Sequence, residues 1–340
     1  MTRFPTLALL ASASAATLSP AASAQLTAYD PFAIGDADSD LNYEDGESLR
    51  SNMPPTLGFD PSIIWGGNSG NFITTTGSLD AQDPTGKVNL LGVGGPASAD
   101  TRFLARNLTP QSSSTFYMGS LVNTGSFNGA GDAPAPINAG SYALTGFINE
   151  GQTAQKLAGP AAGGGNLFGL TWGVGGNAEG DGFDLILRDR HNPAGTGAVG
   201  SDITVANRTL LADAAANTTY EVLLKFEFAT TAEGTAGTGN DLVTYWIGDP
   251  GSFNPLTDAD ASATAISSGV LGSYGFNTPT DLTRGVFAQN SNENGTIFFD
   301  NLALGLDIAT VSAAINPVPE PASAALLAAG AGLLLRRRTA

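Results

Sequence analysis

Hydrophobic and polar residues alternate along much of the chain with the two-residue period of β-strands. The clearest case is 220–228, where one face carries Tyr220, Val222, Leu224, Phe226 and Phe228. Glu221, Lys225 and Glu227 fall on the opposite face, with Leu223 among them. This alternation predicts an antiparallel strand with one buried and one polar face.

The same criterion predicts a series of short strands along the whole chain. The segment 115–122 has apolar residues on both faces, which is typical of the middle of a sandwich. Further strands are predicted at 71–79, 87–91, 102–108, 141–149, 167–172, 183–188, 242–247, 284–289 and 295–304.

Turn-rich segments separate these strands, and 249–273 is predicted to be a long polar loop. No helical period is sustained outside the two ends of the chain. The pattern therefore predicts an all-β chain: a single antiparallel β-sandwich of jelly-roll type with about twelve to fourteen strands. It would occupy residues 25–309, followed by a linker at 310–317.

The N-terminus has the features of a secretory signal peptide. Arg3 supplies a positive charge, 7–18 is apolar or small, and Ala22-Ser23-Ala24 matches a cleavage site. Residues 1–24 are therefore predicted to be removed between Ala24 and Gln25. A permanent N-terminal anchor is the alternative.

The C-terminus combines an apolar run with basic residues. Pro319 and Pro321 keep the chain extended before the uncharged run 322–335, and Arg336, Arg337 and Arg338 follow it. Arginines on one side orient such a run with that side in the cytoplasm. As a helix the run would span about 21 Å, against roughly 30 Å of hydrocarbon, so it suits a short, transient anchor. A buried core helix is the alternative.

This tail resembles the PEP-CTERM sorting signal of Gram-negative bacteria. The motif corresponds to 318–321 with Pro319, Glu320 and Pro321, the short transmembrane helix to 322–335, and the basic end to 336–338, all within 318–340. The resemblance implies a membrane intermediate, transient recognition by an exosortase, cleavage near the motif, and release to the cell surface or extracellular polysaccharide matrix.

The body contains a series of segments in a recognisable order: Tyr29-Asp30-Pro31-Phe32, Trp65-Gly66-Gly67, 115–122, 168–172, 220–228, 242–250 and 299–305. This order resembles the concanavalin A-like, or laminin G-like, sandwich of exported bacterial proteins, especially planctomycete-type PEP-CTERM proteins. The resemblance implies a fold that often binds glycans or protein surfaces, sometimes with calcium at the sheet rim. No ligand motif is matched, so no binding residue is transferred.

The composition of the chain limits which classes of partner it can bind and how it is stabilised. The net charge is −17, and it becomes more negative once the terminal arginines are removed, which opposes binding to nucleic acid or acidic polymers. The chain contains no cysteine. An exported protein could have used disulfides, so its stability must come from a large core.

Calcium is the one cofactor with candidate ligands. Asp36, Asp38, Asp40, Glu44 and Glu47 have the spacing of ligands in an EF-hand loop. However, the position that requires glycine is Leu41, and no amphipathic helices flank the segment. A solvated acidic loop is therefore the favoured interpretation, and no metal ligand is assigned.

Catalytic constellations are scarce. The one histidine, His191, lies in a predicted polar turn, and the lack of cysteine excludes multi-ligand zinc sites. Glu221 and Glu227 lie about 20 Å apart on one strand, too far for glycoside hydrolysis. Trp65, Trp172 and Trp246 could stack on sugars, although core positions are favoured.

The sequence thus predicts an exported, non-enzymatic protein that binds polysaccharide or serves a structural role. It assigns no catalytic or cofactor-binding residue. The alternative is a glycan hydrolase with a carboxylate pair on the sandwich face.

Overall fold

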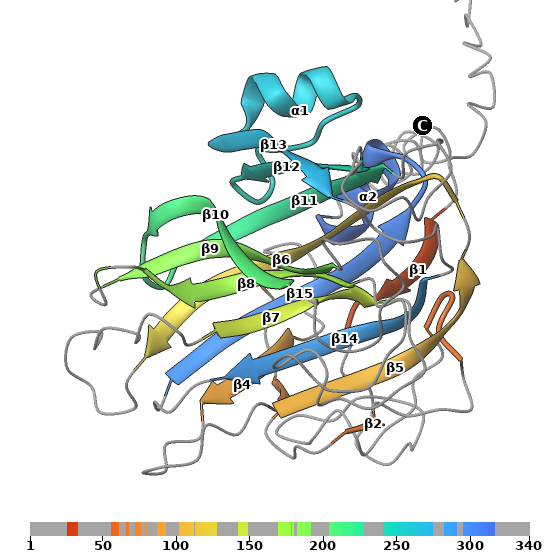
Figure 1. Cartoon of the computed structure of the whole chain (residues 1–340). Coiled ribbons are helices and arrows are strands. Elements are labelled where there is room, and N and C mark those ends of the chain that lie inside the picture. Colours follow the sequence, from red (N-terminus) through yellow and green to blue (C-terminus); the bar gives the residue numbers. More distant parts are fainter. Residues whose placement is uncertain are drawn as a thin grey trace, which may run out of the picture.

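The computed structural model contains two antiparallel β-sheets and two short helices (Figure 1). It describes residues 26–32, 56–60, 66–67, 72–75, 79, 87–92, 102–111, 113–127, 142–148, 169–177, 179, 182–191, 204–227, 241–274, 282–290 and 295–316.

The first sheet has eight strands in the order β13-β12-β11-β6-β15-β4-β3, with β1 paired to β15. Every pairing is antiparallel. The strands are β1 (Leu26–Asp30), β3 (Phe72–Thr75), β4 (Lys87–Gly92), β6 (Thr115–Phe127), β11 (Thr219–Glu227), β12 (Asp241–Gly248), β13 (Ser267–Tyr274) and β15 (Gly295–Gly305).

The second sheet has seven strands in the order β10-β9-β8-β7-β14-β5-β2. It is also antiparallel throughout. Its strands are β2 (Gly66–Gly67), β5 (Arg102–Gln111), β7 (Tyr142–Ile148), β8 (Gly169–Gly176), β9 (Phe183–His191), β10 (Thr204–Ala214) and β14 (Leu282–Asn290).

The main core lies between the two sheets, as a sandwich requires. The face of β11 predicted to be buried contributes Tyr220, Val222, Leu224 and Phe226 to it. Trp172 of β8 is fully buried there, and its indole Nε1 donates to Ser120 Oγ of β6 at 2.8 Å. The all-β, two-sheet prediction is therefore confirmed.

Both helices pack on the outer face of the eight-stranded sheet, on the same side of the molecule (Figure 1). Helix α1 (Asp258–Thr264) lies over Trp246, and α2 (Ile308–Ile315) lies over Leu223 and Ala303. Two predictions are therefore wrong. The segment 249–273 contains α1 and most of β13, and the proposed linker 310–317 contains most of α2, so the packed body extends to Asn316.

The opening and closing motifs tie the ends of the body together. Asp30 forms a fully buried ion pair with Arg106, at 3.6 Å between Oδ2 and Nη1. Asn301 has a φ of 53° at an irregularity in β15. Its amide donates to Ile315 O of α2 and accepts from the Tyr29 hydroxyl of β1. These motif residues therefore have a structural role.

Candidate functional site

The outer face of the eight-stranded sheet has an uncovered area beside α1. Strand register aligns Tyr117, Lys225, Thr244 and Val270 across four strands, from β6 to β13. Val270 is 62% exposed. A neighbouring row contains Thr115, Glu227 and Leu242. We call these seven residues the outer platform.

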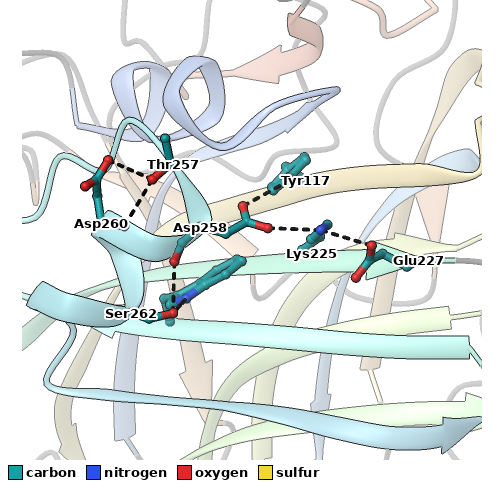
Figure 2. Close-up of polar contacts among 8 residues, drawn as sticks. Tyr117, Lys225, Glu227, Thr257, Asp258, Asp260 and Ser262 are labelled. Carbon is teal, nitrogen blue, oxygen red and sulfur yellow. Dashed lines mark hydrogen bonds and ion pairs between the residues drawn. The ribbon is translucent and has the colours of Figure 1, made fainter.

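Two side chains of the outer platform, Tyr117 and Lys225, converge on the Asp258 carboxylate of α1 (Figure 2). Asp258 accepts a hydrogen bond from the Tyr117 hydroxyl at 3.1 Å and from Lys225 Nζ at 2.9 Å. Lys225 also pairs with Glu227 at 3.0 Å. Its ammonium lies 5.7 Å from the centre of the Tyr117 ring. The four side chains therefore hold one another in a single arrangement.

Helix α1 places Asp258 by standard capping chemistry. Thr257 is the N-cap, and its hydroxyl oxygen accepts from Asp260 N at 3.1 Å. Acidic residues in a first helical turn are favoured by the helix dipole. Below the helix, Trp246 Nε1 donates to Ser262 Oγ at 2.9 Å. That hydroxyl donates to Asp258 O at 2.9 Å (Figure 2). The helix is thereby anchored to the sheet.

Tyr117 and Lys225 both keep their protons near neutral pH. Burial raises the pKa of the Tyr117 hydroxyl to about 12, and the Asp258 carboxylate adds to the rise. Burial alone would lower the pKa of Lys225, but hydrogen bonds to Asp258 and Glu227 outweigh it and raise that pKa. General acid–base catalysis favours groups whose pKa lies near the working pH. The cluster therefore suits binding better than proton transfer.

Glu221, four residues before Lys225 on the same face of β11, has a very different setting. It was predicted to lie on a polar face, but it is fully buried beneath α2. Ser312 Oγ donates to its Oε1 at 2.7 Å, and Asn316 Nδ2 donates to its Oε2 at 3.2 Å. Burial raises the pKa of Glu221 to about 8, although both hydrogen bonds lower it.

Two further acids in the described part of the sandwich, Asp184 and Asp300, have structural partners. Asp184 accepts from Thr209 Oγ1 and Asp213 N, and Asp300 accepts from the main-chain N–H groups of Leu79 and Asn301. Glu221 is inaccessible, and Glu227 is paired with Lys225. These contacts give no support to the predicted alternative of a catalytic carboxylate pair.

The tryptophans follow the favoured interpretation where the structure describes them. Trp172 lies in the sandwich core and Trp246 beneath α1, both fully buried. Neither can stack on an external sugar. Trp65 lies outside the described residues. His191 ends strand β9 rather than lying in a turn, so that prediction is wrong.

The sequence pointed to only part of the Asp258 cluster. Alternation placed Tyr117 and Lys225 on the faces opposite their core neighbours, which is the available signal. Asp258 was missed because 249–273 was interpreted as loop, although Thr257 followed by acids is an N-cap signature.

Metal and sorting predictions fall mostly outside the described residues. Within the described part of the chain, no group of three or more His, Cys, Asp or Glu residues could hold a metal. The acidic segment 36–47, the cleavage site at Ala24 and Gln25, and the sorting segment 318–340 lie outside it. No helix in the described ranges is long and apolar enough to cross a membrane.

Comparison with known proteins shows only distant structural likeness. No protein-family model and no curated protein sequence matches the chain. An endo-β-1,4-glucuronan lyase from the fungus Trichoderma reesei is 12% identical, with a TM-score of 0.44, over 78% of this chain and 96% of that one. The alginate lyase Aly36B is 14% identical, with a TM-score of 0.39, over 78% and 93%.

Lectin II from Ulex europaeus is 11% identical, with a TM-score of 0.37, over 72% of this chain and 96% of that one. Such low identities and scores are too weak to transfer an activity from any of these proteins. The class defined by the structure itself is an antiparallel two-sheet sandwich with a helical cover on one outer face.

Proposed function

We propose that this protein is an exported, non-enzymatic, concanavalin A-like sandwich that binds polysaccharide at the cell surface or in the extracellular matrix. Its outer platform is the binding surface. An exosortase acts on the C-terminal segment 318–340 after the signal peptide 1–24 is removed. The membrane helix 322–335 belongs to the intermediate before that step.

The main support for the binding proposal is the cluster in which Tyr117 and Lys225 bind Asp258 and Lys225 also pairs with Glu227. A sugar has apolar faces that suit an aromatic ring and hydroxyls that need fixed donors and acceptors. Tyr117 packs in part against the cluster beneath the helices and would offer the exposed part of its ring. Lys225 and Glu227 offer polar groups that are already oriented. Preorganisation of this kind lowers the entropic cost of binding.

Charge indicates which polysaccharides fit. The single ammonium of Lys225 faces two carboxylates, so the cluster has an excess of negative charge, and the chain carries −17 overall. Both features repel polyanions. The proposed ligand class is therefore a neutral, hydroxyl-rich glycan.

The decisive experiment is a glycan array with the full chain, followed by titration of the tightest ligand. Tyr117→Ala should weaken binding about tenfold, the equivalent of roughly 1.4 kcal/mol, because the stacking ring is lost. Tyr117→Phe is the matched control, since it retains the ring and removes only the bond to Asp258. The proposal fails if no glycan binds, or if Tyr117→Ala binds as tightly as the wild type.

The hydrolase alternative has a separate readout. Release of new reducing ends from a bound glycan, abolished by replacing two carboxylates, would favour the hydrolase over a protein that only binds.

Cell fractionation tests the sorting proposal independently. The mature chain should appear outside the cell. A variant in which Arg336, Arg337 and Arg338 are replaced should stay in the cell or reach another compartment.

A further inference from the structure

Helix α2 is joined to the sheet by two kinds of contact. Ile308, Val311 and Ile315 are buried against Leu223 and Ala303. The polar contact is the pair of hydrogen bonds from Ser312 and Asn316 to Glu221. The second kind depends on the protonation of a fully buried carboxyl group.

In the part of the chain that the structure describes, no charged group lies against Glu221 to balance its ionised form. Among the described residues, α2 presents only Ser312 and Asn316 to it, and the loop before α1 presents Phe253 O, which also accepts from Ser312 Oγ. The neighbours across the sheet are Leu121 of β6 and Gly248 of β12.

None of the titratable groups described on the adjacent elements is a cation bound to Glu221. Asp300 of β15 pairs with Leu121 in the register and is held by two main-chain N–H groups. Lys225 of β11 and Tyr117 of β6 belong to the Asp258 cluster. Asp307 caps α2 by accepting from Thr310 N, and Asp249 after β12 is exposed. None donates a positive charge to Glu221.

From this geometry we infer that α2 is a detachable clasp, docked while Glu221 is protonated and released when Glu221 ionises. Ionising a carboxyl group in a site without a counter-charge is costly, whereas releasing α2 exposes it to water. The pKa of about 8 in the docked state agrees with this. Docking is complete at acidic pH and is weakened as pH rises from the ordinary carboxyl range to about 8.

The equilibrium between docked and released α2 should depend on pH with a defined slope. Docked and released forms differ by one bound proton between pH 4.5, the ordinary value for Glu, and about 8. The equilibrium constant for release therefore rises about tenfold per pH unit in this window and levels off above it.

Release of α2 would also affect the segment of the chain that follows this helix. Helix α2 ends at Ile315, just before the predicted sorting motif 318–321. As a helix its 8 residues span about 12 Å, and extended they span about 27 Å. Release therefore lengthens the tether between body and tail, a consequence that rests on the proposed sorting function. The pH-dependent release itself does not.

Cysteine labelling tests the clasp directly, because the natural chain has no cysteine. In the full chain, Val311→Cys places a thiol on the buried face of α2, and Ala313→Cys places one on its exposed face. The ratio of their labelling rates cancels the pH dependence of the thiolate. We expect this ratio to rise about tenfold per pH unit from pH 6 to about 8.

Further variants test whether the rise of the labelling ratio with pH depends on Glu221. Glu221→Gln should abolish it, because the amide does not ionise. Glu227→Gln, the same change six positions along β11, should leave it unchanged. Ser312→Ala provides a second test should Glu221→Gln misfold. Removing a donor that lowers the pKa of Glu221 should move the plateau to higher pH.

Three results would overturn the inference. The first is a labelling ratio that does not change with pH, and the second is an equal rise in Glu221→Gln. The third uses Val222→Cys, a thiol on the core face of β11. If it becomes reactive in parallel with Val311→Cys, the whole body unfolds and α2 is no separate clasp.

Discussion

Glu221 and Lys225 lie four residues apart on the same face of strand β11, yet their surroundings are opposite. Lys225 is 17% exposed and meets two carboxylates, one of them from the acidic first turn of α1. Glu221 is fully buried, and the partners described for it are two neutral donors, Ser312 of α2 and its C-cap Asn316. The same strand thus carries one charge with partners of opposite sign and one buried carboxyl group that meets only neutral donors among the described residues.

The difference arises from the helix that covers each residue. Helix α1 presents Asp258 to the sheet, so it is drawn to Lys225 by charge and to Trp246 by packing. Helix α2 contains no charged residue and packs through an apolar stripe. A buried charge is tolerated only with a partner. Burial therefore favours the neutral form of Glu221 and raises its pKa to about 8, whereas the pKa of Lys225 is raised by its hydrogen bonds to Asp258 and Glu227.

The largest expected effect is the pH dependence of stability conferred by Glu221. Its folded pKa of about 8 exceeds the ordinary 4.5, so the folded state loses stability as pH rises from 4.5 to 8 and none beyond. The full shift corresponds to at most about 5 kcal/mol. The loss of stability that can be measured is limited by the free energy of undocking α2.

Glu221→Gln should remove this dependence. In urea titrations the variant should match the wild type near pH 5 and exceed it by a few kcal/mol near pH 9. Lys225→Gln serves as the comparison and should leave the slope in place. Equal slopes in Glu221→Gln and the wild type would show that Glu221 does not titrate as its burial predicts.

The next largest effect concerns the apolar contacts of α2. Ile315 is fully buried, and a Cβ added at Gly119 would lie 2.9 Å from its Cδ1. Ile315→Ala should therefore cost about 2–4 kcal/mol through the cavity it leaves. Leu306→Ala, at a 43% exposed position before the helix, should cost less than about 0.5 kcal/mol. A small loss for Ile315→Ala would mean that α2 contributes little to the body.

Strand alternation explains how much of this comparison could be predicted from sequence. It placed Glu221 and Lys225 on the face opposite the core, and most strands appear where the pattern predicted them. It could not show which part of that face is covered, because Ser312 lies 91 residues from Glu221. Local periodicity contains no information about such distant contacts.

The missed elements share weak local signals. Helices α1 and α2 have only 7 and 8 residues, too short to establish a period. Strand β13 is rich in serine and glycine, and β10 has few apolar residues in alternation. Strand β1 is defined by pairing with β15 at the opposite end of the chain. These elements are stabilised by their tertiary partners more than by their own propensities.

A smaller effect is expected from the Lys225–Asp258 pair. Both side chains reach solvent, so their coupling should be about 0.5–1 kcal/mol and should fall with added salt. A double-mutant cycle with Lys225→Ala and Asp258→Ala, run at low and high salt, measures it. A coupling of several kcal/mol, insensitive to salt, would show that this site is as dry as that of Glu221 and would end the contrast.

The smallest effect separates the Tyr117 hydroxyl from its ring. Tyr117→Phe removes one hydrogen bond to Asp258, which should cost about 0.5–1.5 kcal/mol. In the wild type, burial and Asp258 hold the pKa of this hydroxyl at about 12. Asp258→Asn removes the negative charge, so ultraviolet absorbance should show phenolate forming at lower pH in that variant. If the phenolate appears at the same pH in both proteins, burial alone sets this pKa. Tyr117 would then be held by packing, with Asp258 acting only on Lys225.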